Sequence, residues 1–78
     1  MISMVITDEQ FGANNVTVTL EWSQDEVVFN NVRPPASVRS MGNSSVQLTI
    51  PYNIEHSISV AICGQPSPEA IKIHYSKL

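Results

Sequence analysis

Residues 16–22 read VTVTLEW and alternate strictly between apolar and polar side chains. Successive side chains of a β-strand point to opposite faces, so a period of two predicts a strand with one face in the core. β-branched residues and a terminal aromatic residue favour the same structure. The side chains expected to point inward are Val16, Val18, Leu20 and Trp22. This run constrains the fold more than any other and predicts a β-sheet protein.

Three later stretches, 44–50, 56–63 and 69–75, repeat the alternation. Lys72 and His74 are expected to point outward from the last of these stretches. Shorter strands are expected at 3–7 and 27–32, the second with a bulge, because its apolar residues fall on both faces. The inward positions of the three long stretches are Val46, Leu48, Ile50, His56, Ile58, Val60, Ile62, Ile71, Ile73 and Tyr75.

Turn-forming residues separate the predicted strands, and no stretch of ten or more residues shows helical spacing. Prolines are expected in the connecting segments and outside the strands. Six or seven short strands, each with one apolar face, predict an antiparallel two-sheet β-sandwich. A length of 78 residues allows one domain, residues 1–78. The predicted turns are 8–15, 23–26, 33–35, 41–43 and 63–69.

The order of these features resembles a fibronectin type III domain over nearly the whole chain. VTVTLEW resembles that family's second strand with its inward Trp22, and VVFNNV places Phe29 at the usual aromatic position of the third. SSVQLTIPYNIEHSISVAIC resembles the fifth strand, the corner and the sixth strand, with Leu48 at the family's leucine position. The chain is shorter than a typical member around 36–45, so the fourth strand is expected to be vestigial. The proline-rich entry to the first strand is also missing.

A further departure from the family lies at the corner, where His56 replaces the usual tyrosine. In sandwiches of this type the corner tyrosine hydrogen-bonds to nearby backbone. The resemblance therefore implies a structural role for His56, whose ring can present an N–H over a shorter reach. Tyr52 is expected to share this role or to cover the corner from outside. Trp22, Leu48 and Tyr75 complete the set of expected core and corner residues.

The composition and motifs predict neither catalysis nor nucleic-acid binding. Four basic residues are scattered along a chain of net charge −3, so no basic stripe is available for phosphates. No apolar run approaches the ~20 residues that would insert into a membrane. His56 and His74 are expected to face opposite ways, and no nucleophile elbow or glycine-rich phosphate loop occurs. We therefore predict no catalytic, cofactor-binding or metal-binding residue.

Several single features leave alternatives open. Cys63 is the only cysteine, so it is either a small, partly buried side chain at a strand end or a partner for a cysteine outside this segment. Asn15 and Asn43 each begin an N-glycosylation acceptor pattern. Ser76-Lys77-Leu78 matches a peroxisomal address, but a domain boundary after Tyr75 is the explanation we favour.

The resemblance implies a non-enzymatic extracellular module in a cell-surface, adhesion or receptor protein. It would bind a protein partner or neighbouring domains through a sheet edge or through loops at 23–26, 51–55 and 63–69. The opening residues lack the basic region of a signal peptide, so a secreted form is expected to be longer. The alternative is a standalone binding module, intracellular or carbohydrate-associated. Within the third loop, the expected contact residues are Gln65, Pro66, Ser67 and Pro68.

Overall fold

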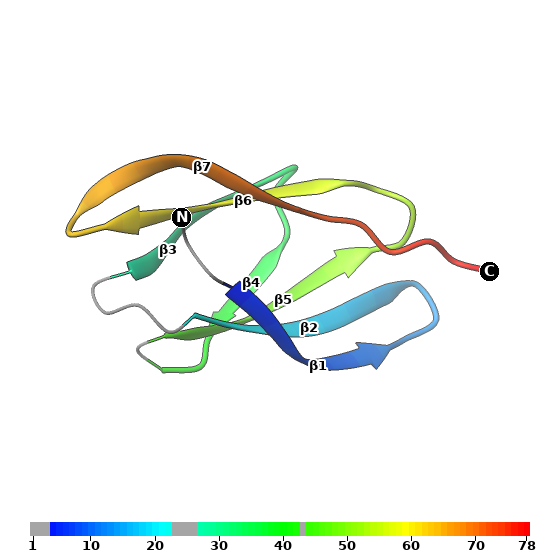
Figure 1. Ribbon diagram of the computed structural model, residues 1–78. Coiled ribbons are helices and arrows are strands. Elements are labelled where there is room, and N and C mark those ends of the chain that lie inside the picture. The colour runs from blue at the N-terminus through cyan, green and yellow to red at the C-terminus, as the bar shows by residue number, and fades with distance from the viewer. Residues whose placement is uncertain (1–3, 23–26, 43) are drawn as a thin grey trace.

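The computed structural model describes residues 4–22, 27–42 and 44–78, which form seven β-strands (Figure 1). Within these ranges, no helix is long and apolar enough to cross a bilayer. The strands are β1 (Met4–Phe11), β2 (Asn15–Trp22), β3 (Val27–Arg33), β4 (Ser37–Ser40), β5 (Ser45–Pro51), β6 (His56–Ile62) and β7 (Gln65–Ile73).

The strands form two antiparallel sheets that lie face to face (Figure 1). One sheet has the order β1-β2-β5-β4 and the other has the order β3-β6-β7. This arrangement confirms the predicted all-β, two-sheet sandwich. As expected for a vestigial fourth strand, β4 has only four residues, and all of them are exposed.

The core lies between the sheets: the predicted inward faces of β2 and β5 line it from one sheet, and residues of β3, β6 and β7 line it from the other. Val18 of β2 pairs with Leu48 of β5, and both side chains are fully buried. Packing the apolar face of one sheet against that of the other removes these side chains from water, which is the main favourable term in folding. The core cluster is Val16, Val18, Leu20, Trp22, Val27, Val32, Val46, Leu48, Ile50, Ile58, Val60 and Ile73.

The predicted bulge in the third strand is present. The pairing of β3 with β6 shifts between Phe29 and Asn31. One extra residue moves the side chains after it to the other face. Val27 and Val32 are therefore both buried, whereas Val28 is 51% exposed.

One inward assignment in the sixth strand is wrong. Ile62 is 39% exposed, and its neighbour Ala61 is buried instead. The pairing of β6 with β7 shifts between Ser59 and Ala61. The alternation in the sequence does not reveal where the strand pairing shifts, so the predicted facing was wrong only for residues after the shift.

The predicted loop at 63–69 is also wrong, because β7 begins at Gln65. The connection is a two-residue turn in which Cys63 and Gly64 have φ values of 51° and 81°. Two positive φ angles suit a tight hairpin whose twist matches its flanking strands. Pro66 and Pro68 consequently lie inside a strand, contrary to expectation. The strand tolerates them because β7 is an edge strand with an irregular pairing at this point.

The first predicted turn is shorter than expected. Residues 8–11 belong to β1, which pairs with β2 up to the Phe11–Val16 pair. Only residues 12–14 remain as the connection between these two strands. β1 is thus a long edge strand of eight residues.

Candidate functional site

The corner between β5 and β6 is built around a buried histidine. The side chain of His56 is 1% exposed, and its Nδ1 lies 3.2 Å from the carbonyl oxygen of Ile54. A carbonyl only accepts, so this contact requires a proton on Nδ1. His56 therefore closes its own corner by donating to the backbone two residues earlier.

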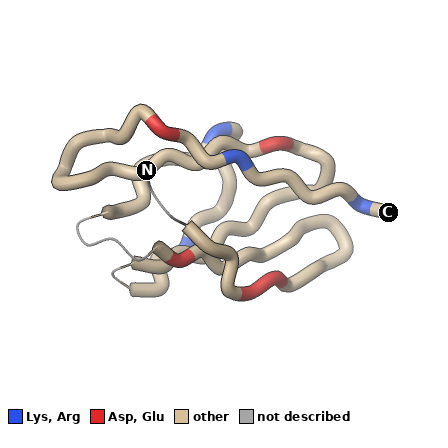
Figure 2. The backbone as a smooth tube through the Cα atoms, in the orientation of Figure 1, with Lys and Arg blue, Asp and Glu red and all other residues tan. Residues whose placement is uncertain are grey.

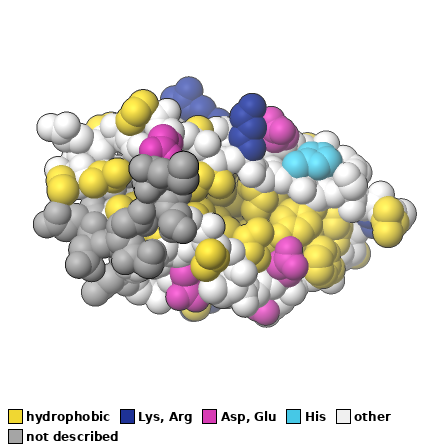
Figure 3. Space-filling view, viewed as in Figure 1, with side chains coloured by type: hydrophobic (Ala, Val, Ile, Leu, Met, Phe, Trp, Pro, Cys, Tyr) yellow, Lys and Arg dark blue, Asp and Glu magenta, His cyan; other side chains and the backbone are white. Residues whose placement is uncertain are grey.

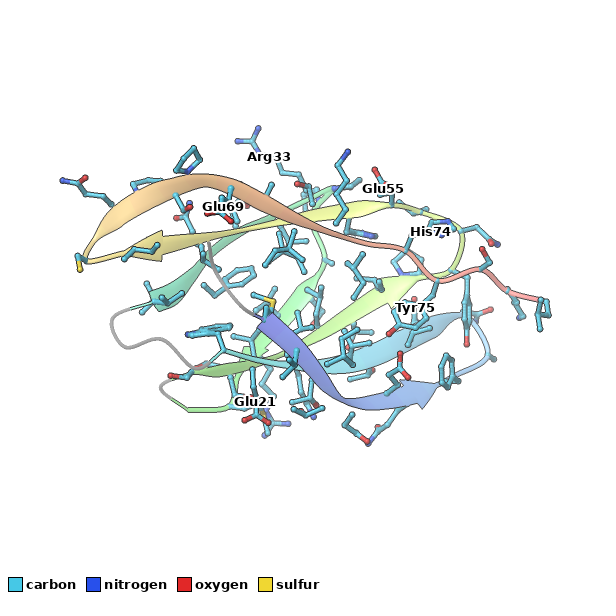
Figure 4. The ribbon with its side chains drawn as sticks, in the orientation of Figure 1. Glu21, Arg33, Glu55, Glu69, His74 and Tyr75 are labelled. Atoms are coloured by element: carbon cyan, nitrogen blue, oxygen red, sulfur yellow. The ribbon has the colours of Figure 1, made fainter. Side chains whose placement is uncertain are left out.

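Replacement of His56 by alanine is expected to lower the free energy of unfolding by about 2–3 kcal/mol. The change leaves the Ile54 carbonyl without this donor and opens a cavity in the core. Urea denaturation measures the effect. His74→Ala is the matched control, because His74 is exposed at the end of the chain and should change stability by less than about 0.5 kcal/mol (Figure 4). Equal effects of the two substitutions would contradict the buried role of His56.

Tyr52 and Asn53 connect this corner to two other segments. The Tyr52 hydroxyl donates to the carbonyl oxygen of Gly12 at 2.7 Å. The backbone N–H of Asn53 donates to the carbonyl oxygen of Tyr75, also at 2.7 Å. Lys77 lies 5.6 Å from the centre of the Tyr52 ring and donates to the carbonyl oxygen of Ala13. One end of the sandwich is therefore closed by contacts between three segments far apart in sequence.

Tyr75 joins the two sheets at the same end. From the segment after β7 its side chain reaches toward β1, where its hydroxyl donates to the Glu9 carboxylate (Figure 4). Its ring meets the Phe11 ring edge-on, with centroids 5.8 Å apart. Burial, together with the hydrogen bond and the charge of Glu9, raises the pKa of Tyr75 to about 12. The contact thus favours the neutral phenol.

This shift predicts a loss of stability at high pH. The folded state holds the Tyr75 proton up to a pKa of about 12, whereas the unfolded chain releases it near 10. The stabilising contribution is therefore fully present below pH 10 and is lost as the pH rises toward 12. We expect the difference in unfolding free energy between the wild type and Tyr75→Phe to shrink over this interval. A difference that stays constant from pH 8 to 12 would contradict the contact.

The residues predicted as an interaction loop form part of an exposed edge strand. Gln65, Pro66 and Pro68 are exposed, and Ser67 is half-buried. The predicted loops also do not gather at one end of the sandwich. Segment 51–55 precedes β6, whereas the Cys63-Gly64 turn follows it, so a whole strand separates them. Segment 23–26 lies outside the described residues.

The remaining single-residue predictions fall on the surface or beyond the described residues. Cys63 is exposed in its hairpin turn rather than partly buried at a strand end. Asn15 is exposed at the start of β2 and suits a glycan acceptor. Asn43 lies outside the described residues.

Two concavities of the described surface are large enough to consider as binding sites. The larger, about 450 Å³, lies beside the β1–β2 connection, and its lining contains amides, hydroxyls and the Phe11 ring. The smaller, about 260 Å³, opens between β3 and β4 and is mostly apolar. Over residues 4–22, 27–42 and 44–78, no three His, Cys, Asp or Glu side chains lie close enough to hold a metal ion. The neutral groups of the larger concavity suit an uncharged polar ligand.

Comparisons with protein-family models, with curated proteins and with solved structures found no match for this chain. The sandwich architecture is therefore established by the structure itself.

The main surface feature that the sequence prediction missed is the β1 edge. Val5 is 56% exposed, Ile6 is 46% exposed and Phe11 is 64% exposed on this one strand. The sequence does contain a signal, because apolar residues flank the acidic pair Asp8-Glu9 without strict alternation. An apolar strand that does not alternate, followed by charges, suits an exposed edge.

Proposed function

We propose that this chain is a non-enzymatic interaction or spacer module of an extracellular protein, of the cell-surface, adhesion or receptor type. The fibronectin-like sequence pattern supports the proposal. So does the strand order: with the strands lettered A to G along the chain, the sheets are ABED and CFG. Constant-type immunoglobulin domains have this order, and many cell-surface domains share the architecture.

The observation that carries the proposal is the path of the chain through the sandwich. Met4 pairs with Trp22 at one end of the first sheet. Ile73 pairs with His56 at the corner end, where the C-terminal segment extends outward (Figure 1). A module that is entered at one end and left at the other separates its neighbours along its 38 Å axis. Such a path suits a spacer between domains.

The experiment is secretion of the chain from mammalian cells behind a cleavable leader. We expect a folded, released protein that carries a glycan at Asn15, because that side chain is exposed. Asn15→Gln, which removes the acceptor, is the control for the mass shift. Retention and degradation in the secretory pathway, together with normal folding in the cytosol, would contradict an extracellular module.

A carbohydrate-associated binding module is the second candidate, favoured by the concavity beside β1. Its hydrogen-bonding groups are the amides of Gln10, Asn14 and Asn15 and the hydroxyls of Thr17 and Thr49. Neutral donors and acceptors beside an exposed aromatic ring suit a sugar. A glycan array compared between the wild type and Phe11→Ala tests this function. Sugar binding that disappears in the variant would support it, and the absence of binding by the wild type would contradict it.

A further inference from the structure

We propose that the outer edge of β1 binds an extended peptide segment of another protein, in which apolar residues alternate with lysine or arginine. The bound segment adds as a strand antiparallel to β1 and covers the opening between β1 and β7. This inference rests on the proposed function and specifies its partner surface.

The first observation is that β1 has a strand on one side only. It lies at the end of the sheet order, with β2 as its single neighbour. Half of its backbone N–H and C=O groups therefore face outward, which makes an edge strand a template for another chain. Pairing with an added strand satisfies these groups through main-chain hydrogen bonds.

The second observation is exposed apolar surface that points between the sheets. Ile6 pairs with Leu20 and Phe11 pairs with Val16, so both share the inward face of the sheet. Leu20 and Val16 are buried, yet Ile6 and Phe11 are 46% and 64% exposed, because no strand lies beyond β1. Figure 3 shows the resulting strip of hydrophobic surface in the opening between β1 and β7. Alternate side chains of an added strand would cover this strip.

The other edges in the described part of the chain are less suited to strand addition. β4 has only four residues. β7 contains Pro66 and Pro68, which lack an N–H, and the pairing of β3 shifts near its middle. Such features blunt sheet edges against a further strand. β1 has one irregularity of its own, between Ile6 and Asp8, but runs for eight residues.

Charge decides the chemistry of the occupant. Asp8 and Glu9 lie on β1, and Glu69 and Lys72 lie on β7 of the other sheet, where Lys72 is 3.7 Å from Glu55. Figure 2 shows acidic residues in both layers. Four carboxylates against two ammonium groups, those of Lys72 and of Lys77, which donates to the carbonyl oxygen of Ala13 just after β1, favour a basic partner. A second copy of this chain would bring two Asp8-Glu9 pairs together across the new interface, and like charges on paired strands are destabilising. The acidic edge therefore selects a basic segment over self-association.

The test is NMR titration of the chain with a synthetic peptide of alternating lysine and valine, seven residues long and capped at both ends. We expect shifts of the β1 amides, binding that weakens as salt is added, and little response to a peptide of the same composition in which the alternation is broken. A peptide with glutamate in place of lysine should bind at least about tenfold more weakly.

Matched variants locate the site. Ile6→Lys should weaken binding about tenfold, whereas Val28→Lys, at a similarly exposed position on the β3 edge, should leave it unchanged. Phe11→Lys replaces Ile6→Lys if the first variant does not fold. The proposal would be overturned if the peptide did not bind, or if the chemical-shift changes centred on β3 or β4. It would also be overturned if the peptide with broken alternation bound equally well, or if the chain dimerised through β1. None of these results affects the secretion test of the proposed function.

Discussion

Leu48→Ala is expected to lower the free energy of unfolding by about 2–5 kcal/mol. Leu48 is fully buried at the centre of β5, where it faces Val18 on one side and Val38 on the other. Its truncation removes apolar contacts and leaves a cavity that neighbouring strands cannot fill without breaking register. A domain of 78 residues has only about 4–12 kcal/mol of stability in total. The variant should therefore be marginally folded.

Urea denaturation followed by circular dichroism measures this loss. Val38→Ala is the matched control, because Val38 pairs with Leu48 but is 36% exposed on the edge strand β4. We expect it to cost less than about 1 kcal/mol. If Val38→Ala cost as much as Leu48→Ala, the core would not lie where the two sheets place it.

Trp22→Ala is the second large expected effect, at about 3–5 kcal/mol. The indole is 5% exposed, and its Nε1–H donates to the carbonyl oxygen of Val27 at 2.7 Å. Trp22 ends β2 in one sheet and Val27 begins β3 in the other. The side chain therefore both fills the core and ties the two layers together.

Two further variants separate these contributions. Trp22→Phe keeps most of the apolar volume but leaves the Val27 carbonyl without its donor, so it should cost about 1–3 kcal/mol. Phe11→Ala removes an aromatic ring that is 64% exposed and should cost less than about 1.5 kcal/mol. If the Trp22→Ala and Phe11→Ala variants had the same thermal stability, Trp22 would not be part of the core.

The architecture could be predicted because its strands bury one face each. Val16, Val18 and Leu20 alternate without interruption, and only a strand with one buried face explains that spacing. The prediction was wrong at Ile62, where the strand pairing shifts, and at Pro66 and Pro68, where an edge strand accepts prolines. An edge strand needs hydrogen bonds on one side only, so residues that a central strand excludes are tolerated there.

The candidate site was harder to predict because it depends on contacts between distant segments. The hydrogen bond from Tyr75 to Glu9 joins residues 66 positions apart. The β1 edge became visible only when the sheet order showed that β1 has one neighbour. The side-chain pattern of a strand indicates which of its faces is buried, but it does not indicate which strand lies at the edge of a sheet.

A nuclear Overhauser spectrum of the folded chain tests the strand pairing of both sheets. We expect α-proton or amide cross-peaks between Val18 and Leu48, between Val38 and Leu48, and between Ile58 and Ile71. Cross-peaks that pair residues 37–40 with β3, or sequential amide contacts typical of a helix through 44–63, would contradict the two-sheet sandwich.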